Sequence, residues 1–174
     1  MDGATLRELQ APLKERYRSD PAAALVTLQA QGDLGSDGVT CKVGTGRALA
    51  EAGLHPATGG DGTLLCSGDM LLEALVACAG VTLGAVSTSL GIAINEGRVR
   101  AEGDLDFRGT LGVDKEAPVG FRDIRLSFEL QTDADDEQLA TLLKLTERYC
   151  VVLQTLARGP ELDVTLERAT AATA

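Results

Sequence analysis

The chain has 174 residues, of which 44% are hydrophobic and 24% are charged, a composition typical of a globular protein and not of a disordered one. Its 16 basic and 26 acidic side chains give a formal net charge of −10, which argues against nucleic acid or an anionic membrane surface as the main partner. This length fits one domain that can bury a sizeable apolar interior.

The N-terminal part of the chain contains short segments separated by turn formers. Residues 4–18 predict a short polar helix, and residues 24–30 and 39–43 predict strands; in the second of these strands apolar and polar side chains alternate. Residues 44–62 are rich in glycine and predict a long loop, which has room for a short strand or a turn of helix. A loop of this length is often functional.

Residues 68–90 form a long apolar segment without strand alternation. Apolar side chains surround nearly the whole circumference of the helix that this segment predicts, and such a helix should be central and buried. Asp69 lies in its first turn, where a carboxylate suits the helix dipole. No charge occurs between Glu73 and Glu96, a span long enough to cross a bilayer, but small and hydroxylated residues are frequent in it. We therefore expect a core helix, no membrane partner and, because no apolar signal opens the chain, a cytoplasmic protein.

The C-terminal half predicts two strands, a helix and a final strand. Residues 99–107 and 124–130 alternate apolar and polar side chains, as in strands with one wet face. Thr132 and Asp135 resemble a capping box, and an apolar stripe from there predicts one helix that Gly159-Pro160 stops. Three alternating apolar residues predict the last strand: Leu162, Val164 and Leu166.

The order of these elements indicates an α+β fold in which antiparallel sheet packs on helices. We divide the chain into an N-terminal helical extension over residues 1–22, one domain over residues 23–168 and a flexible tail over residues 169–174.

The four cysteines have no CxxC spacing, which disfavours a structural zinc site, and no metal or organic cofactor is implied. A protein without a secretion signal is also not expected to carry a structural disulfide framework. Cys41 lies on the inward face of a strand and is expected in the core. Cys66, just before the apolar helix, is read as a packing residue, with a third redox thiol as the alternative.

Cys78 lies in the middle of the apolar helix, and Cys150 lies on the apolar stripe of the later helix. In the plainest interpretation each packs as a small hydrophobic residue. In a sharper interpretation the two helices bury these faces against each other, so that the thiols meet in one pocket. A thiolate of low pKa beside a resolving thiol is the arrangement that reduces peroxides.

Two segments around these cysteines, SGDMLLEALVACAGVTLGAV and LLKLTERYCVVLQTL, resemble the OsmC/Ohr family of thiol peroxidases. The resemblance extends over most of residues 24–167. It implies an OsmC-like α+β fold in which antiparallel sheets wrap around long central helices in an intertwined homodimer, with each active site at the dimer interface.

The resemblance also implies the chemistry. Cys78 matches the peroxidatic cysteine, which attacks a hydroperoxide and becomes a sulfenic acid, and Cys150 matches the resolving cysteine, which condenses with it to a disulfide. A dithiol reductant, either a lipoyl-bearing or a thioredoxin-like protein, then restores both thiols.

Burial alone raises the pKa of a thiol, so a cation should stand near Cys78. The family uses an arginine from the N-terminal half, held by a carboxylate at the start of the central helix. Arg47 is our preferred candidate, because a loop can fold over a helix, and Arg18 is the alternative. Asp69 lies closest to the family's carboxylate position, with Glu73 one turn further along as its rival.

We therefore predict a two-cysteine peroxidase that prefers organic hydroperoxides, because the neighbours of Cys78 in the sequence are apolar. One alternative is a non-peroxidatic OsmC-like protein whose apolar dimer cleft binds a small molecule. Another is a purely structural domain, in which Cys78 and Cys150 would lie far apart. His55, the one histidine, has no carboxylate or cysteine partner nearby in the sequence and is read as a loop residue.

Overall fold

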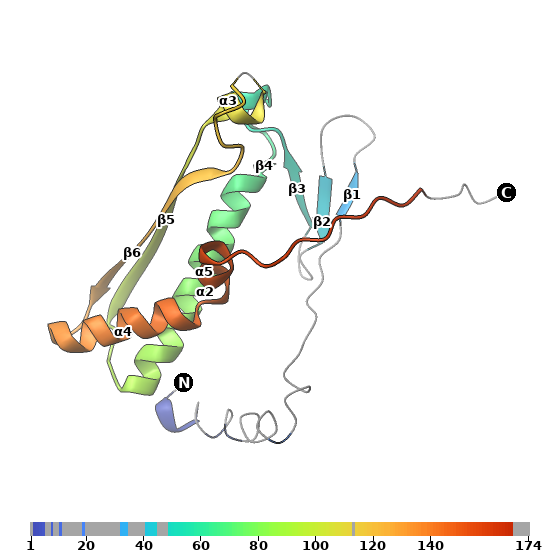
Figure 1. The fold of residues 1–174 in the computed structure, drawn as a ribbon. Coiled ribbons are helices and arrows are strands. Elements are labelled where there is room, and N and C mark those ends of the chain that lie inside the picture. Colours follow the sequence, from blue (N-terminus) through green and yellow to red (C-terminus); the bar gives the residue numbers. More distant parts are fainter. Residues whose placement is uncertain are drawn as a thin grey trace.

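The computed structural model describes residues 2–5, 8, 11, 19, 32–34, 41–44, 49–112 and 114–168 (Figure 1). Residues 3–5, 8, 11 and 19 are helical, and the rest of the predicted N-terminal helix lies outside this range. The predicted strand over residues 24–30, Arg18, Arg47 and the C-terminal tail also lie outside the described residues.

A four-stranded sheet comes first in the chain, in the order β1 (Gly32–Leu34), β2 (Cys41–Gly44), β3 (Leu49–Gly53) and β4 (Leu65–Cys66). β1, β2 and β3 pair antiparallel, and β4 joins β3 in parallel. β2 confirms the predicted strand there, and its cysteine stands at the position opposite Ala52. The predicted long loop holds both β3 and a 3₁₀ turn, η2 (Pro56–Thr58), so it is more ordered than its glycine content suggests.

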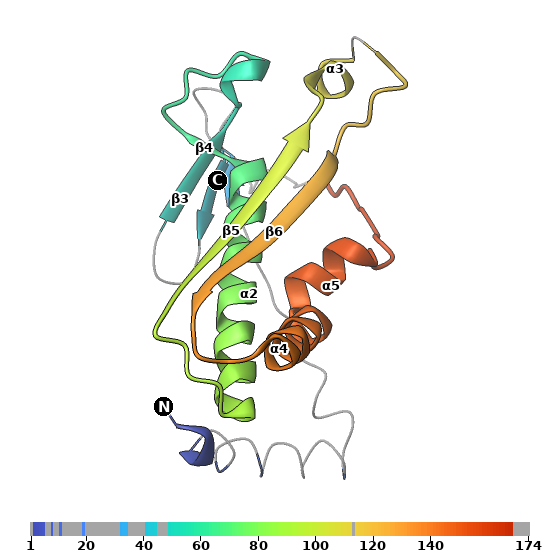
Figure 2. The ribbon, with the colours of Figure 1, turned by 90° about the vertical axis from the view of Figure 1, so that its left-hand side faces the viewer.

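The long helix α2 (Ser67–Leu90) has 24 residues and runs through the middle of the molecule (Figure 2). Gly91 ends it with φ 73°, a backbone conformation that glycine adopts without strain, and its amide donates to the carbonyls of Ser87 and Thr88. Leu75, Ala79 and Leu83 recur at four-residue spacing and are buried against the rest of the chain.

The prediction that α2 is buried on all sides is wrong for the single protomer. Val81, on another side of the helix, is 76% exposed, and Leu71 and Leu90 are exposed as well. In the described part of the chain α2 is also the one helix whose length and apolarity would allow it to cross a membrane, and 22% of its apolar window is buried. The same test is passed by the core helix of a soluble protein, and α2 packs against β5, α4 and α5.

Strands β5 (Glu96–Leu105) and β6 (Phe121–Gln131) form a long antiparallel ribbon that lies against α2 (Figure 2). Both confirm predicted strands. β5 stops two residues short of the predicted end, because the side chain of Asp106 caps the short helix α3 (Phe107–Thr110) by accepting a hydrogen bond from the Arg108 amide. A Cβ atom at Gly103 would lie 2.5 Å from the Phe121 ring, so the absence of a side chain lets that ring close over β5.

The predicted C-terminal helix is two helices, α4 (Asp136–Tyr149) and α5 (Val151–Ala157). The predicted capping box is wrong by one turn. Asp135 is the N-cap and accepts from the Gln138 amide at 2.8 Å, while the Gln138 side chain accepts from the Asp135 amide at 3.0 Å. Thr132 instead donates to the Ala93 carbonyl at 2.6 Å, which ties this segment to the chain before β5.

Residues 159–168 have no regular secondary structure, so the predicted last strand is wrong for the protomer. A strand needs a neighbour for its backbone groups, and none of the described strands pairs with this segment. The segment runs away from α5 as an extended trace (Figure 1). Its three alternating apolar side chains are almost fully exposed: Leu162 at 85%, Val164 at 89% and Leu166 at 99%.

Candidate active site

The structure brings the two predicted redox cysteines together. Cys78 is half-buried in the middle of α2, and Cys150 is 0% exposed at the junction of α4 and α5. Both are free thiols, and Cys78 packs against the buried cluster that contains Cys150, near enough for each thiol to shift the pKa of the other. The interpretation in which these cysteines are far apart is therefore wrong.

Packing between α2 and the C-terminal helices positions Cys78 next to Cys150. Leu75, Ala79 and Cys150 form one buried cluster, and Ala79 allows close approach because it is small. The inner face of the β5–β6 ribbon closes the cluster from the other side. Cys78 belongs to the partly buried residues that pack against it, which are otherwise all apolar: Val99, Ala101, Ile124, Leu126, Phe128, Val152 and Leu153.

The helix break at Cys150 gives the site its hydrogen-bond donors. Cys150 has φ −72° and ψ 106°, so it is extended, and it ends α4 while it begins α5. The first amides of a helix have no carbonyl partner within that helix. Here the amides of Val151 and Val152 lie near enough to the Cys78 sulfur to lower the pKa of that thiol by hydrogen bonding. The break therefore directs backbone N–H groups at a side chain of another helix.

These contacts move the pKa values of the two thiols in opposite directions. Burial opposes ionisation of Cys78, but hydrogen bonds from the Val152 amide, the Cys150 thiol, the Val151 amide and Thr82 together outweigh it and lower the Cys78 pKa below the ordinary thiol value. Burial raises the pKa of Cys150, and the neighbouring Cys78 raises it further, against the amides of Leu153 and Val152. Cys78 thus ionises first, and Cys150 keeps its proton.

The predicted activating carboxylates lie at the start of α2. Asp69 and Glu73 are both exposed, and neither has a hydrogen bond or an ion pair to any other described residue. Their expected partners Arg47 and Arg18 fall outside that set. Within the described residues, the groups that lower the pKa of Cys78 are therefore the Cys150 thiol, Thr82 and two backbone N–H donors. Sequence reasoning missed these donors, because an apolar stripe that runs through Cys150 gives no sign of a break.

Cys66 stands apart from the pair. It is the half-buried N-cap residue of α2, 12 residues before Cys78, which corresponds to about 18 Å along a helix. A Cβ atom placed at Gly68 would lie 3.6 Å from its sulfur and 3.4 Å from the Phe121 ring. This apolar setting agrees with the packing role expected for it.

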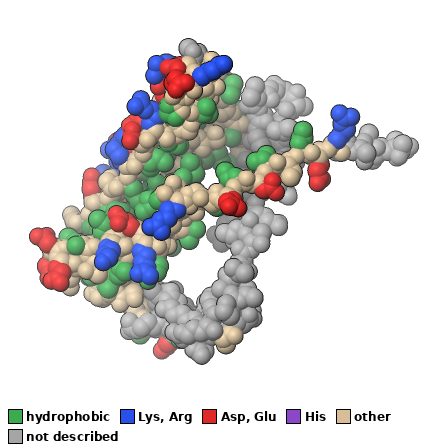
Figure 3. Space-filling view, in the orientation of Figure 1, with side chains coloured by type: hydrophobic (Ala, Val, Ile, Leu, Met, Phe, Trp, Pro, Cys, Tyr) green, Lys and Arg blue, Asp and Glu red, His purple; other side chains and the backbone are tan. Residues whose placement is uncertain are grey.

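A largely apolar groove follows β6 on the side of the ribbon that faces the C-terminal helices. Two adjoining cavities, of about 490 and 460 Å³, lie between β6 and the α4–α5 pair and share Leu126, Phe128 and Leu143. Leu126 and Phe128 also pack on the cluster that holds Cys150. Hydrophobic side chains gather over this region in Figure 3. Neither cysteine lines these cavities, so the groove is separated from the sulfur atoms by the side chains that pack on the cluster, and Arg122, Asp123 and Glu147 add charge at one end of it.

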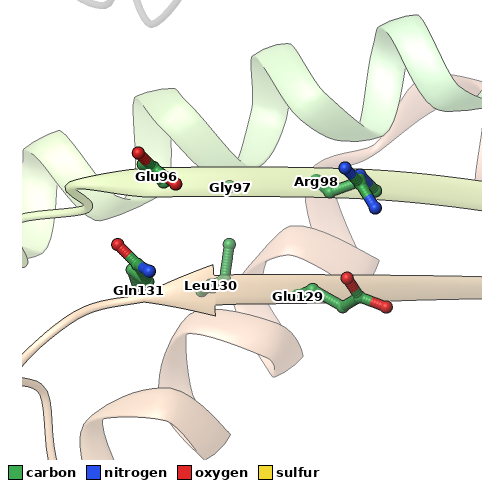
Figure 4. Close-up of a pocket in the computed structure, with 6 residues that line it drawn as sticks. All are labelled: Glu96, Gly97, Arg98, Glu129, Leu130 and Gln131. Carbon is green, nitrogen blue, oxygen red and sulfur yellow. The ribbon is translucent and has the colours of Figure 1, made fainter.

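A third cavity, of about 290 Å³, lies at the far end of the β5–β6 ribbon (Figure 4). Its polar side chains Glu96, Arg98, Glu129 and Gln131 are exposed, while Leu130 packs into the second apolar cluster. It is part of the solvated outer face of the ribbon. In the described part of the chain no three His, Cys, Asp or Glu side chains group as metal ligands.

Comparison with known proteins agrees with this fold. The family model for the OsmC-like protein matches residues 60–165, more than half of the chain, and the chain belongs to this family. No curated protein gives a significant match.

Solved structures with the same fold include an OsmC-like protein from Mycoplasma pneumoniae, with a TM-score of 0.64, 16% identity, and coverage of 77% of this chain and 89% of that one. An organic hydroperoxide resistance protein from Elizabethkingia anophelis has a TM-score of 0.61 and 18% identity, with coverage of 78% and 90%. The organic hydroperoxide resistance protein OsmC from Legionella pneumophila has a TM-score of 0.59 and 16% identity, with coverage of 78% and 91%.

Proposed function

We propose that this protein is a thiol-dependent peroxidase that reduces organic hydroperoxides, with Cys78 as the peroxidatic and Cys150 as the resolving cysteine. The observation that carries the proposal is the contact between two thiols whose pKa values are shifted apart, lowered at Cys78 and raised at Cys150. A thiolate is the nucleophile that a peroxide needs, and a protonated thiol in contact with it is spared for the second step. Membership of the OsmC-like family supports a redox role.

In the proposed reaction the Cys78 thiolate attacks the terminal peroxide oxygen. An S–O bond forms as the O–O bond breaks, and the alkoxide takes a proton and leaves as alcohol. The sulfur of Cys150 then attacks the Cys78 sulfenic acid, an S–S bond forms, and water leaves. Two electrons have passed from the thiol pair to the peroxide, and a lipoyl-bearing or thioredoxin-like dithiol protein returns them by disulfide exchange.

The apolar groove along β6 supports an organic substrate. Leu126 and Phe128 line it and also pack on the cluster that contains Cys150, so an alkyl group held there would be one layer of side chains away from the thiols. Hydrogen peroxide has no apolar part and would gain nothing from this surface.

We further propose that Arg47, with Arg18 as the alternative, adds positive charge beside Cys78 and is oriented by Asp69 or by Glu73. The two carboxylates lie four residues apart on α2 and share a face near its start. Alanine at Arg47 should slow the reaction of Cys78 with peroxide, whereas alanine at Arg18 should not. The opposite result would assign the role to Arg18.

We also propose an intertwined homodimer in the cytoplasm, formed by the domain over residues 23–168 with its N-terminal extension and flexible tail. The exposed apolar side of α2, with Val81 at its centre, and the exposed segment with Leu162, Val164 and Leu166 are surfaces that a monomer would leave in water. A second copy that packs along α2 and shares its sheets would cover both. Val81→Asp should therefore shift the sedimentation of the protein from dimer to monomer.

The direct test of the peroxidase is a thiol count on the fully reduced protein before and after one equivalent of cumene hydroperoxide, with the oxidised peptides mapped by mass. We expect two thiols to be lost within seconds and to be recovered as a Cys78–Cys150 disulfide. Cys66→Ser is the matched control and should lose the same two thiols. If all thiols stay free after minutes, the proposal is wrong, and the groove should be screened for a bound ligand.

A further inference from the structure

A threonine one turn beyond Cys78 on α2 carries an inference about how the reactive sulfur is held. Thr82 and Cys78 are four residues apart, so their side chains lie on the same face of the helix. The Thr82 hydroxyl donates to the carbonyl oxygen of Cys78 at 2.8 Å and is half-buried beside it. One hydroxyl therefore stands within reach of both the backbone and the side chain of this cysteine.

This inference rests on the proposed role of Cys78 and adds a residue to it. We propose that Thr82 is a positioning residue, whose hydroxyl turns from the Cys78 carbonyl to the Cys78 sulfur when the thiol ionises and then donates a hydrogen bond to the thiolate. The rotation needs no movement of the backbone, because the hydroxyl hydrogen turns freely about its C–O bond. The carbonyl it leaves keeps its bond within the helix.

The surroundings of Cys78 make such a donor important. Within the described part of the chain, Cys150 is the titratable group that faces Cys78. The charged side chains of β5, β6 and α4 are exposed, and α5 carries none. Arg122, Asp123 and Glu147 line the cavity between β6 and the C-terminal helices, which does not include Cys78. Asp69 and Glu73, on α2 itself, are exposed as well. A thiolate here depends on hydrogen bonds, and Thr82 is one of those that lower the pKa of Cys78.

The plain structural alternative is that Thr82 only bonds its own helix, as serine and threonine often do. Thr88 does this on the same helix, where its hydroxyl donates to the Gly84 carbonyl at 2.8 Å. Thr88 is therefore a matched control, since it has the same geometry but no cysteine beside it.

The experiment measures the alkylation rate of Cys78 in the full-length reduced protein against pH, resolved by peptide mass so that the other thiols do not interfere. In Thr82→Val we expect the midpoint of the profile to rise by about 1 pH unit, and the rate well below the midpoint to fall about tenfold. Thr82→Ser, which keeps the hydroxyl, should restore the wild-type profile. Thr88→Val should leave it unchanged.

A folded Thr82→Val variant with the wild-type profile, or a shift of the same size in Thr88→Val, would overturn the inference. If Thr82→Val does not fold, Thr82→Ala replaces it, because alanine removes the hydroxyl and suits a helix. The measurement uses no peroxide. If Thr82→Val shifts the profile but the wild-type protein does not reduce peroxide, the role of Thr82 stands and the proposed function is refuted. If the wild-type protein reduces peroxide but Thr82→Val has the wild-type profile, the proposed function stands and the role of Thr82 is refuted.

Discussion

Cys78 and Cys150 are in contact, yet the helices that carry them differ in one respect. α2 continues without interruption through Cys78, so every amide near that residue is used within its own helix. The chain around Cys150 is broken, and the break frees the amides of Val151 and Val152. The amides freed at Cys150 help to lower the pKa of Cys78, whereas burial and the neighbouring Cys78 raise the pKa of Cys150 against amides at the same break. Two similar thiols thereby acquire different pKa values, to which the backbone break contributes together with burial and the neighbouring side chains.

The largest effect should come from removing the thiol on the unbroken helix. Cys78→Ser replaces the sulfur by an oxygen that stays protonated near neutral pH, and peroxide consumption should fall by about a thousandfold or more. The measurement is loss of cumene hydroperoxide with excess dithiol. Thr88→Ser, on the same helix and away from the thiols, keeps the hydroxyl that bonds the Gly84 carbonyl; it is the control for handling and should retain full activity. Substantial turnover by Cys78→Ser would place the nucleophile elsewhere.

Cys150→Ser removes the thiol at the helix break and tests its role as the resolving cysteine. This variant should still consume one equivalent of peroxide, because Cys78 keeps its neighbouring amides, but its sulfenic acid should persist since no resolving thiol follows. Trapping with dimedone and mass mapping should find the label on Cys78. A Cys78–Cys66 disulfide in this variant would instead show that Cys66 can act as a third redox thiol.

The next largest effect is expected from a substitution that weakens the packing between α2 and the C-terminal helices. Leu75 is 0% exposed in the cluster with Cys150, and Leu75→Ala should lower the free energy of unfolding by about 3 kcal/mol. Leu71, on the same helix, is 38% exposed, so Leu71→Ala should cost less in the protomer. Urea unfolding at several protein concentrations measures both. A larger cost at Leu71 that depends on concentration would indicate that a second copy covers it.

The opposite pKa shifts predict an order of reactivity. As pH rises, Cys78 should become alkylated at lower pH than Cys150, with a midpoint below that of a free thiol. The linked effects on stability have opposite signs. The lowered pKa of Cys78 contributes stability above the unfolded thiol pKa, which is lost as pH falls through the folded value. The raised pKa of Cys150 contributes stability at low pH, which is lost as pH rises through its folded value. Equal midpoints for the two cysteines would contradict the role of the break.

Sequence reasoning was sufficient where a pattern is local and strong. The alternation in β5 and β6 and the long apolar run of α2 predicted those elements, and OsmC-like segments predicted the family. It failed where geometry depends on tertiary contacts. Cys150 lies in a stripe of helix formers, and no glycine or proline marks its extended backbone. Leu162 and its alternating neighbours have a strand pattern but no partner strand among the described residues of one protomer.

The smallest effect concerns the tip of the β5–β6 ribbon, where a charge pair sits in water and not in an apolar cluster. Asp106 caps α3, and hydrogen bonds from the Arg108 side chain and amide hold the pKa of this carboxyl down to about 2. Because the folded pKa lies below the unfolded one, the stabilisation is present above the unfolded carboxyl pKa and is lost as pH falls toward about 2. Asp106→Asn should therefore flatten the acid side of the stability profile only slightly, since the Arg108 side chain of the pair is 61% exposed to solvent. Urea midpoints between mildly acidic and neutral pH measure this, with Asp133→Asn, at an exposed position before α4, as the control.

The same variant tests whether the ribbon tip and the thiol pair are independent of each other. We expect Asp106→Asn to leave the Cys78 alkylation profile unchanged. A changed profile would show that the two regions are coupled.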